Sequence, residues 1–283
     1  MSHGLQTWSS PADVDIGVIY THEDHLMDPL LNSLRDSGDQ LDMRLILIDN
    51  ASQRGADRWQ SVFSNTLVVR NQNRLGYAAN LNRILQNSDA PYILLLNTDM
   101  YFNPDMQCIT RMVRFMDAHW DCGIAGCGLY HPDEAFAYPA RRFQSLKTIA
   151  ARRLGLSGFW PEELNDYLYR HESPKSIFEC EWLSGCFLMV RRLAFEDIGY
   201  LDDQFGKYFE DVDFCLRAAM HGWKIMFNGE TYAYHLEQRS SHRVFSVDAV
   251  RHIRAYARWL RKWGLNPRNH LPVPIPDEIR RAA

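Results

Sequence analysis

The sequence predicts an α/β protein whose central sheet is mostly parallel and flanked by helices. Short apolar runs alternate with segments of helical periodicity through residue 128, which is the pattern of repeated βαβ units. The run 92–96 (YILLL) is too apolar to face water on either side, as expected of a strand covered on both faces. Crossovers in such units are right-handed, and ligands bind beyond the carboxyl ends of the strands. The fold class therefore also predicts where a site would lie.

The first 130 residues supply strands and helices in alternation. Leu26, Leu30 and Leu34 recur at helical spacing, and Pro104 suits the first turn of another helix. A polar helix is expected after Ser52. We therefore expect strands at 14–21, 43–48, 66–70 and 92–96 and one containing Cys122 and Cys127, with helices at 24–34, 76–85 and 104–119.

The pattern changes after residue 130. Residues 131–181 are rich in Arg, aromatic residues and Pro with weak periodicity, which indicates an excursion over one face of the sheet. Regular structure then resumes, and the proline-rich tail 266–283 is expected to be irregular. The expected elements are a strand at 182–190, a helix at 210–221, short strands at 223–227 and 231–235, and a helix at 247–263.

Composition excludes several classes of protein. The 283 residues carry a formal net charge of −4 and a mean hydropathy of −0.36, which are ordinary values for a globular domain. This balance excludes a protein held to nucleic acid by bulk charge. No apolar stretch approaches the roughly 20 residues that span a bilayer. The start, MSHGLQTWSSPADVD, has neither a basic nor an apolar region, so no secretory signal is expected.

The six cysteines include no CxxC pair, and a chain of this length does not need disulfides for stability. Cys122 and Cys127 have a spacing compatible with zinc, but they lie in an apolar run predicted as a strand. Buried reduced thiols are the favoured interpretation, and the expected compartment is the cytoplasm.

Two common phosphate-binding motifs are not found. The sequence contains no GxxxxGK[ST], which excludes a P-loop enzyme. Gly126 and Gly128 follow an expected strand, but His131 stands where the third glycine of a dinucleotide-binding motif would be. A dinucleotide site is therefore not favoured.

Polar residues follow several of the predicted strands. Thr21, Asp49 and the segment 97–99 each lie just past a strand, at the edge where parallel sheets bind ligands. Asp99 can present carboxylate oxygens to a divalent cation beside a diphosphate. The alternative is that Asp99 caps the helix expected from Pro104 or forms an Asx turn.

Three acidic residues open the helix expected at 210–221. Helix N-termini favour negative charge, which by itself explains one or two of them. Glu210 and Asp211 lie in the first turn, toward the same edge as Asp99, where a carboxylate can accept a proton from an attacking hydroxyl. His235 ends the last expected strand and is either structural or a ligand for a divalent metal.

Six segments follow one another in a characteristic order. They are Asp49-Asn50-Ala51-Ser52, Asn73-Arg74-Leu75-Gly76-Tyr77-Ala78-Ala79-Asn80, Leu96-Asn97-Thr98-Asp99, Trp182-Leu183-Ser184-Gly185, Glu210-Asp211-Val212-Asp213 and His235. In this order and spacing the chain resembles family 2 glycosyltransferases of the GT-A fold, and within them the bacterial rhamnosyltransferase-like branch. The resemblance covers about residues 14–240. Each motif is weak alone, and their order makes the resemblance specific.

The resemblance implies a site for a nucleotide-sugar. Its residues would be Thr21, Asp49, Gly76, Asn80, Asn97 and Thr98. Thr21 and Asp49 would hold the base and ribose. Gly76 would let the backbone approach the nucleotide closely, and Asn80, one helical turn later, would support it.

The resemblance also implies the chemistry. Asp99 and His235 would bind Mg²⁺ or Mn²⁺ on the diphosphate, where the cation neutralises charge on the leaving group. Asp211 would be the general base that activates an acceptor hydroxyl, with Glu210 as the second choice, and a single displacement would invert the anomeric centre. Trp182 would either stack on an acceptor sugar or belong to the core.

The family pattern differs at one position. Many relatives carry Asp-x-Asp where this chain has Asn97-Thr98-Asp99, although the rhamnosyltransferase-like branch often has Asn there. Because an amide offers one neutral oxygen, the cation would be held by Asp99, His235, phosphates and water. Metal-independent transfer is the alternative.

We therefore predict one GT-A domain over residues 1–265. Its nucleotide-sugar-binding half spans about 12–130, its acceptor-binding half about 131–245 and an amphipathic helix 246–265. The donor would be dTDP-rhamnose-like or a UDP-sugar, and the acceptor a hydroxyl of a glycan or a lipid-linked glycan. The alternatives are a catalytically inactive nucleotide- or carbohydrate-binding relative and a metal-dependent nucleotidyltransferase. The latter would need glycines and basic residues in the loop 21–25, which has neither lysine nor arginine.

Basic residues gather in two segments of the second half. The first is a cluster that is either a solvated helix face or a contact for an anionic acceptor: Arg141, Arg142, Lys147, Arg152 and Arg153. In 247–263 one helical face is apolar and the rest is rich in Arg, which is typical of a helix on an anionic membrane surface. That apolar face comprises Val250, Ile253, Tyr256, Leu260 and Trp263. We therefore expect a cytoplasmic protein. The helix 247–263 would make peripheral contact with the inner face of the membrane, pack on the core or form a homodimer contact, and the sequence leaves these alternatives open.

Overall fold

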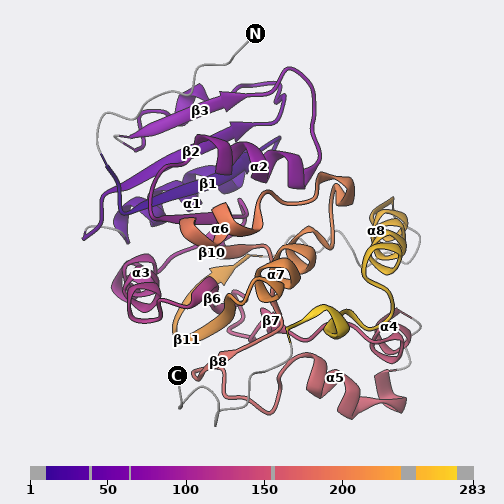
Figure 1. Ribbon diagram of the computed structural model, residues 1–283. Coiled ribbons are helices and arrows are strands. Elements are labelled where there is room, and N and C mark those ends of the chain that lie inside the picture. Colours follow the sequence, from indigo (N-terminus) through magenta and orange to yellow (C-terminus); the bar gives the residue numbers. More distant parts are fainter. Residues whose placement is uncertain (1–10, 38–39, 64, 154–156, 237–246, 273–283) are drawn as a thin grey trace.

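One large sheet runs through both halves of the chain (Figure 1). The computed structural model describes residues 11–272 except 38–39, 64, 154–156 and 237–246. The sheet strands are β1 (Val14–Tyr20), β2 (Met43–Asp49), β3 (Thr66–Arg70), β4 (Tyr92–Leu96), β5 (Met100–Tyr101), β6 (Cys122–Tyr130), β8 (Ile177–Glu179), β10 (Phe187–Arg191) and β11 (Lys224–His235). Their order is β3-β2-β1-β4-β10-β6-β11-β5, and β8 pairs with β11 off this path.

The sheet is mostly parallel, as predicted. β3, β2, β1 and β4 are parallel neighbours, β10 is inserted antiparallel between β4 and β6, and β6 is parallel to β11. The carboxyl ends of β1, β2, β4, β6 and β11 therefore open at one edge. This is the edge at which the candidate residues were expected.

Helices cover both faces of the sheet. One face packs against α1 (Asp24–Asp36) and α3 (Cys108–Ala118), through residues such as Leu30 and Met112. The other packs against α2 (Tyr77–Asn87), α6 (Arg192–Ile198) and α7 (Glu210–Met220), through residues such as Leu81 and Leu216. Burying each such side chain stabilises the fold by roughly 1.5–3 kcal/mol. All six cysteines are buried thiols.

Two expected helices are shorter than the sequence suggested. The polar helix after Ser52 is one 3₁₀ turn, η1 (Asp57–Trp59). The helix from Pro104 is divided into the 3₁₀ turn η2 (Pro104–Met106) and α3, because Gln107 between them adopts a left-handed conformation with φ of 46°. An L-residue in that region cannot continue a right-handed helix.

The second half contains more regular structure than predicted. The excursion includes α4 (Leu146–Arg153), η3 (Ser157–Phe159) and α5 (Pro161–Tyr167). The expected strand 182–190 is broken at 184–186: β9 (Trp182–Leu183) pairs with β7 (Ala140–Arg141) in a small second sheet, and β10 enters the main one. The two strands expected after residue 222 form the single strand β11, with an irregularity between Asn228 and Tyr232.

The final helix α8 (Val247–Trp263) packs on the core. Trp259 is buried, with its ring 6.0 Å from Phe143 and 5.7 Å from Phe209. The expected tail begins with a 3₁₀ turn, η6 (Pro267–His270), and its residues 273–283 lie outside the described part. Among the described residues, no helix has the length and apolarity needed to cross a bilayer.

Candidate functional site

The strand-end residues divide into exposed and buried groups. Thr21, Asn97, Thr98, Asp99, Asp211 and His235 are partly exposed at the carboxyl edge, and Gly76 is exposed. Asp49, Asn80, Trp182 and Glu210 are buried. The two groups differ in what they can do, because only the first can touch a ligand without rearrangement.

Asp99 and His235 meet as the sequence predicted. Asp99 Oδ2 lies 3.2 Å from His235 Nε2. The pairing follows from the edge of the sheet: β5 runs antiparallel to the end of β11 with Met100 opposite His235, and Leu236 N–H donates to the Asp99 carbonyl oxygen at 2.8 Å. Two short strands thus hold a carboxylate and an imidazole side by side.

This pair fits a divalent cation. Two ligands in adjacent positions on an octahedral Mg²⁺, each about 2.1 Å from the ion, lie about 3 Å apart, close to the observed separation. Within the described ranges no group of three or more His, Cys, Asp or Glu side chains is arranged to hold a metal ion. The remaining ligands would therefore come from a substrate and water. His131 stands behind the pair, with its ring stacked 6.4 Å from that of His235.

Asp211 is held at the start of α7. Gly185 N–H donates to its Oδ2 at 2.9 Å, and Val212 N–H donates to its Oδ1 at the same distance. Burial raises the pKa of Asp211, and the two N–H groups together with the positive charge of Arg141 limit this rise. Each oxygen keeps a second acceptor position. The carboxylate is therefore positioned to receive a proton.

Glu210 has a different environment. It is buried, and among the described residues its Oε2 has no hydrogen-bond partner. Burial and then the negative charge of Asp211 raise the pKa of Glu210 well above the usual range. When the two compete for one proton, Glu210 keeps it and Asp211 is ionised. This difference favours Asp211 over Glu210 as a proton acceptor near neutral pH.

Tyr77 is a site residue that the sequence analysis did not single out. Its hydroxyl donates to Asn97 Oδ1 at 2.7 Å and lies 3.4 Å from the Gly185 carbonyl oxygen. Burial raises the pKa of Tyr77 far above its ordinary value, so the hydroxyl remains a donor. Tyr77 thus links the loop that carries Asp99 to the turn that holds Asp211. The only sequence signal was its place beside Gly76 in the NRLGYAAN segment.

Asp49 shapes a loop. Its carboxylate accepts from Ser52 N–H at 2.8 Å, Ala56 N–H at 3.2 Å and Arg70 Nε at 3.1 Å. Burial opposes ionisation, but these donors outweigh it and hold the pKa of Asp49 below its usual value. Its neighbour at the strand ends, Thr21, is partly exposed and donates its N–H to Glu23 at 3.0 Å.

Gly76 and Asn80 organise the entry to α2. Asn80 Nδ2 donates to the Gly76 carbonyl oxygen at 2.9 Å, and its Oδ1 accepts from Asn71 at 2.6 Å. A Cβ on Gly76 would lie 3.3 Å from the Cα of Gly206. The close approach that Gly76 permits in the structure is therefore that of the protein's own 203–206 turn, and Asn80 acts on the loop.

Trp182 is a core residue, the second of the two predicted alternatives. It is buried, its Nε1 donates to the Arg142 carbonyl oxygen at 2.7 Å, and the Arg141 guanidinium lies 5.1 Å from its ring centre. The basic cluster is thereby divided. The charge of Arg141 acts on Asp211 and limits the rise of its pKa, whereas Arg142 pairs with Asp166 at 3.0 Å. The side chains of Arg152 and Arg153 lie outside the described part.

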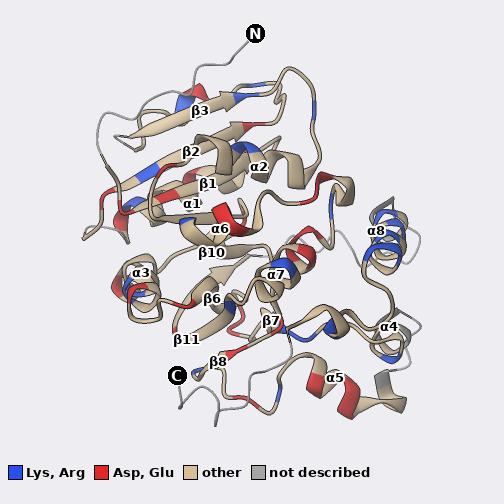
Figure 2. Ribbon diagram, viewed as in Figure 1, with Lys and Arg blue, Asp and Glu red and all other residues tan. Residues whose placement is uncertain are grey.

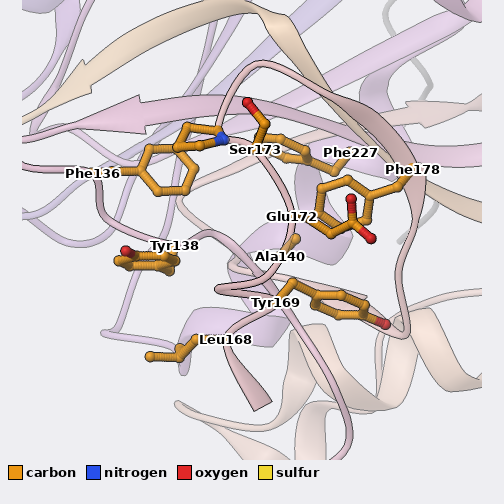
Figure 3. A pocket seen from close by; sticks show the side chains of 10 residues that line it. Phe136, Tyr138, Ala140, Leu168, Tyr169, Glu172, Ser173, Phe178 and Phe227 are labelled. Atoms are coloured by element: carbon orange, nitrogen blue, oxygen red, sulfur yellow. The ribbon is translucent and has the colours of Figure 1, made fainter. Parts of the chain in front are cut away.

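The structure also contains a small cavity, whose lining residues Figure 3 shows. Its walls are mostly aromatic and include Phe136, Tyr138, Tyr169, Phe178 and Phe227. Its volume is about 10 Å³, room for about one water molecule, and none of the candidate residues lines it. The cavity is therefore not an alternative candidate for the ligand-binding site.

The fold and site together define a glycosyltransferase of the GT-A type. The model of glycosyl transferase family 2 matches residues 15–199, and the chain belongs to this family. The rhamnosyltransferase-like resemblance is confirmed by its relatives. N-acetylglucosaminyl-diphospho-decaprenol L-rhamnosyltransferase of Mycobacterium tuberculosis (strain H37Rv) is 28% identical over 257 residues, which cover 81% of this chain and 83% of that protein. Rhamnosyltransferase WbbL of Escherichia coli (strain K12) is 27% identical over 187 residues, covering 64% and 66%.

Solved structures support the fold. A mannosyltransferase from Pyrobaculum calidifontis, in complex with GDP-Man and Mn²⁺, aligns with a TM-score of 0.59 at 15% identity, covering 89% of this chain and 65% of that one. GalNAc-T7 with UDP, GalNAc and Mn²⁺ aligns with a TM-score of 0.62 at 11% identity, covering 89% and 49%. At these identities the likeness concerns the fold alone.

Proposed function

We propose that the protein transfers a rhamnosyl group from a nucleoside-diphosphate donor, dTDP-rhamnose or a close analogue, to a hydroxyl of a lipid-linked glycan, with inversion. The observation that carries this proposal is the placement of Asp211, held by Gly185 N–H and linked through Tyr77 to the loop of Asp99. The choice of sugar and acceptor rests on the names of the two rhamnosyltransferase relatives.

The donor would occupy the edge formed by the ends of β1, β2 and β4. Its base and ribose would lie near Thr21, and its diphosphate near Asp99 and His235, which would hold a Mg²⁺ or Mn²⁺ ion. When bound, this ion supplies positive charge that stabilises the leaving nucleoside diphosphate. Tyr77 keeps the Asn97–Asp99 loop in place through its bond to Asn97.

The acceptor hydroxyl would attack from the side of Asp211. Its oxygen forms a bond to the anomeric carbon while the bond from that carbon to the diphosphate oxygen breaks, and the bonding electrons leave with the nucleoside diphosphate. The hydroxyl proton passes to the Asp211 carboxylate. Because the nucleophile and the leaving group are on opposite faces of the sugar, the anomeric configuration inverts.

Arg141 would contribute to binding of the acceptor. It lies beside Trp182 in the small second sheet, and its charge acts on Asp211. A guanidinium there can form bidentate hydrogen bonds with a phosphate group of the acceptor. We propose that Arg141, rather than the whole predicted basic cluster, contacts the acceptor diphosphate.

The test is a transfer assay with a synthetic GlcNAc-diphospho-lipid and each of dTDP-rhamnose, UDP-glucose and UDP-GlcNAc, with Mn²⁺ or with chelator. We expect product from dTDP-rhamnose with metal, and NMR of the product should show an anomeric configuration opposite to that of the donor. Transfer with retention would overturn the role of Asp211. Calorimetric titration of dTDP and UDP with and without Mn²⁺ supplies the donor class independently of turnover.

A further inference from the structure

The exposed face of α8 is apolar as well as basic. Trp259 and Ala255 are buried, which uses one side of the helix for core packing. Ile253 keeps 66% of its surface exposed, and Val250 is exposed beside it. The predicted apolar face is therefore divided: Tyr256, Leu260 and Trp263 pack against the core, and the first two residues remain on the surface.

The neighbouring excursion exposes further large apolar side chains. Phe159, in the turn between α4 and α5, is 77% exposed, and Leu146 and Trp160 are exposed as well. α8 adjoins this region through the stacked rings of Phe143 and Trp259, and Figure 1 shows α8 and α4 on the same side of the molecule. Large apolar side chains concentrated on one side of a protein mark an interaction surface.

Positive charge accompanies this surface. From residue 250 to 263, α8 carries four arginines and one lysine and no acidic residue, and Figure 2 shows α8 and α4 marked by basic residues. Lys262 is engaged by Asp202 and Asp213, both at about 2.7–2.8 Å. Arg254 and Arg261 are exposed on the outer side of the helix. The neighbouring helix α5 carries acidic residues in its first turn. The positive charge on this side of the molecule is therefore centred on α8.

We propose that α8, α4 and the turn 157–160 form a docking surface for a bilayer containing anionic lipids. Ile253 and Phe159 would enter the interface, and Arg254 and Arg261 would meet the headgroups, because apolar side chains bordered by basic ones bind such surfaces. This inference rests on the proposed function in one respect: a lipid-linked acceptor resides in the same bilayer.

Docking would also orient the catalytic helix. Trp263 Nε1 donates to Asp213 Oδ1 at 2.8 Å, and Lys262 Nζ lies 2.8 Å from the same oxygen. Asp213 is fully buried two residues after Asp211. The end of α8 is thus fixed to the beginning of α7, so a membrane that holds α8 also sets the position of the proposed base relative to the bilayer.

The experiment is co-sedimentation of the full chain with vesicles of phosphatidylcholine, alone or mixed two to one with phosphatidylglycerol. We expect binding to the mixed vesicles that weakens with salt. Ile253→Glu and Phe159→Glu should each reduce the partition coefficient at least about tenfold, and Arg254→Gln or Arg261→Gln about fivefold. Matched controls are Leu193→Glu, at 63% exposure, and Trp120→Glu, at 78%, both outside this surface; their binding should equal that of the wild type.

Transfer assays separate this inference from the proposed function. Docking variants should transfer normally to a short-chain acceptor in solution and slowly to the same headgroup embedded in vesicles. Transfer in solution without vesicle binding by the wild type, or equal losses in the control variants, would overturn the docking surface and leave the function standing. Vesicle binding with the expected variant pattern, but no transfer to either acceptor, would retain the surface and overturn the function.

Discussion

Gly185 donates its backbone N–H to Oδ2 of Asp211 at 2.9 Å, across 26 residues of sequence. The bond exists because the expected strand 182–190 is interrupted at 184–186. There the chain leaves the small sheet, where Ser184 N–H still bonds to the Pro139 carbonyl oxygen, and enters the main sheet at Phe187. An uninterrupted strand would have used Gly185 N–H in the ladder. The break in the strand therefore positions the carboxylate.

Gly185→Ala tests this relationship. The added Cβ would lie 3.3 Å from Asp211 Oδ2 and 3.4 Å from Asp211 Cβ, so the carboxylate must shift by a few tenths of an ångström. We expect kcat to fall about 10- to 100-fold, because small misplacements of a catalytic group are costly, while the donor KM stays within about twofold. An unchanged kcat in steady-state kinetics would show that the contact does not position the base.

Asp211→Asn should lower kcat by about 10²–10⁴-fold, because an amide cannot accept the proton, while calorimetric affinity for dTDP with Mn²⁺ stays nearly intact. Glu210→Gln is the matched comparison, since it alters the adjacent carboxyl, and it should retain most of the activity. Equal losses of turnover and nucleotide affinity in Asp211→Asn would exclude the base assignment.

Tyr77→Phe should lower kcat several-fold by releasing the Asn97–Asp99 loop, at a stability cost of about 1 kcal/mol for one hydrogen bond. Tyr92→Phe is a suitable control, because its hydroxyl bonds to Asp117 at 2.5 Å at the other end of β4. It should cost similar stability in urea unfolding and leave kcat unchanged. If both variants lose activity in proportion to stability, Tyr77 has no positioning role.

The sequence was sufficient for the parallel sheet and for the meeting of Asp99 with His235, because strand ends and family order locate them without knowledge of packing. It was not sufficient to predict which side chains of the motifs point into the core and which point toward the site. Trp182 and Asn80 belong to the motifs, yet both are buried, and whether an aromatic or amide side chain points inward depends on neighbours far away in sequence. Tyr77 was missed for the same reason, since its partners Asn97 and Gly185 are 20 and 108 residues away.

The break at Gln107 and the division of α8 show a second limit. Periodicity predicted the helical segments, but a single left-handed residue at Gln107 separates η2 from α3. In α8 the spacing of the apolar residues predicted one buried face that includes Ile253. In the structure the buried side is centred on Trp259, and Ile253 is exposed. Core packing against Phe143 and Phe209 decides this rotation, and periodicity alone carries no information about it.

Glu210 predicts a pH dependence of stability. Its pKa in the folded protein is raised, chiefly by burial and then by Asp211, above the value of about 4.3 expected in the unfolded chain. Between those two values the folded state holds the extra proton, so the stability of the wild type falls as pH rises through this window. Glu210→Gln removes this decrease in stability, because the amide does not titrate. In urea unfolding the variant should therefore gain stability relative to the wild type from about pH 4 upward; a difference that does not change with pH would contradict a protonated Glu210.

Asp99→Ala should weaken dTDP binding only when Mn²⁺ is present. Asp99 Oδ2 and His235 Nε2 are 3.2 Å apart, and removing either would leave the cation with one protein ligand, since the described part offers no third one beside them. We expect the Mn²⁺-induced gain in nucleotide affinity to fall at least tenfold in calorimetry, with metal-free affinity unchanged. His131→Ala is the control: its ring stacks behind His235, and its loss should reduce the gain by less than the loss of either ligand. An unaltered Mn²⁺ dependence in Asp99→Ala would remove Asp99 as a ligand and favour the metal-independent alternative.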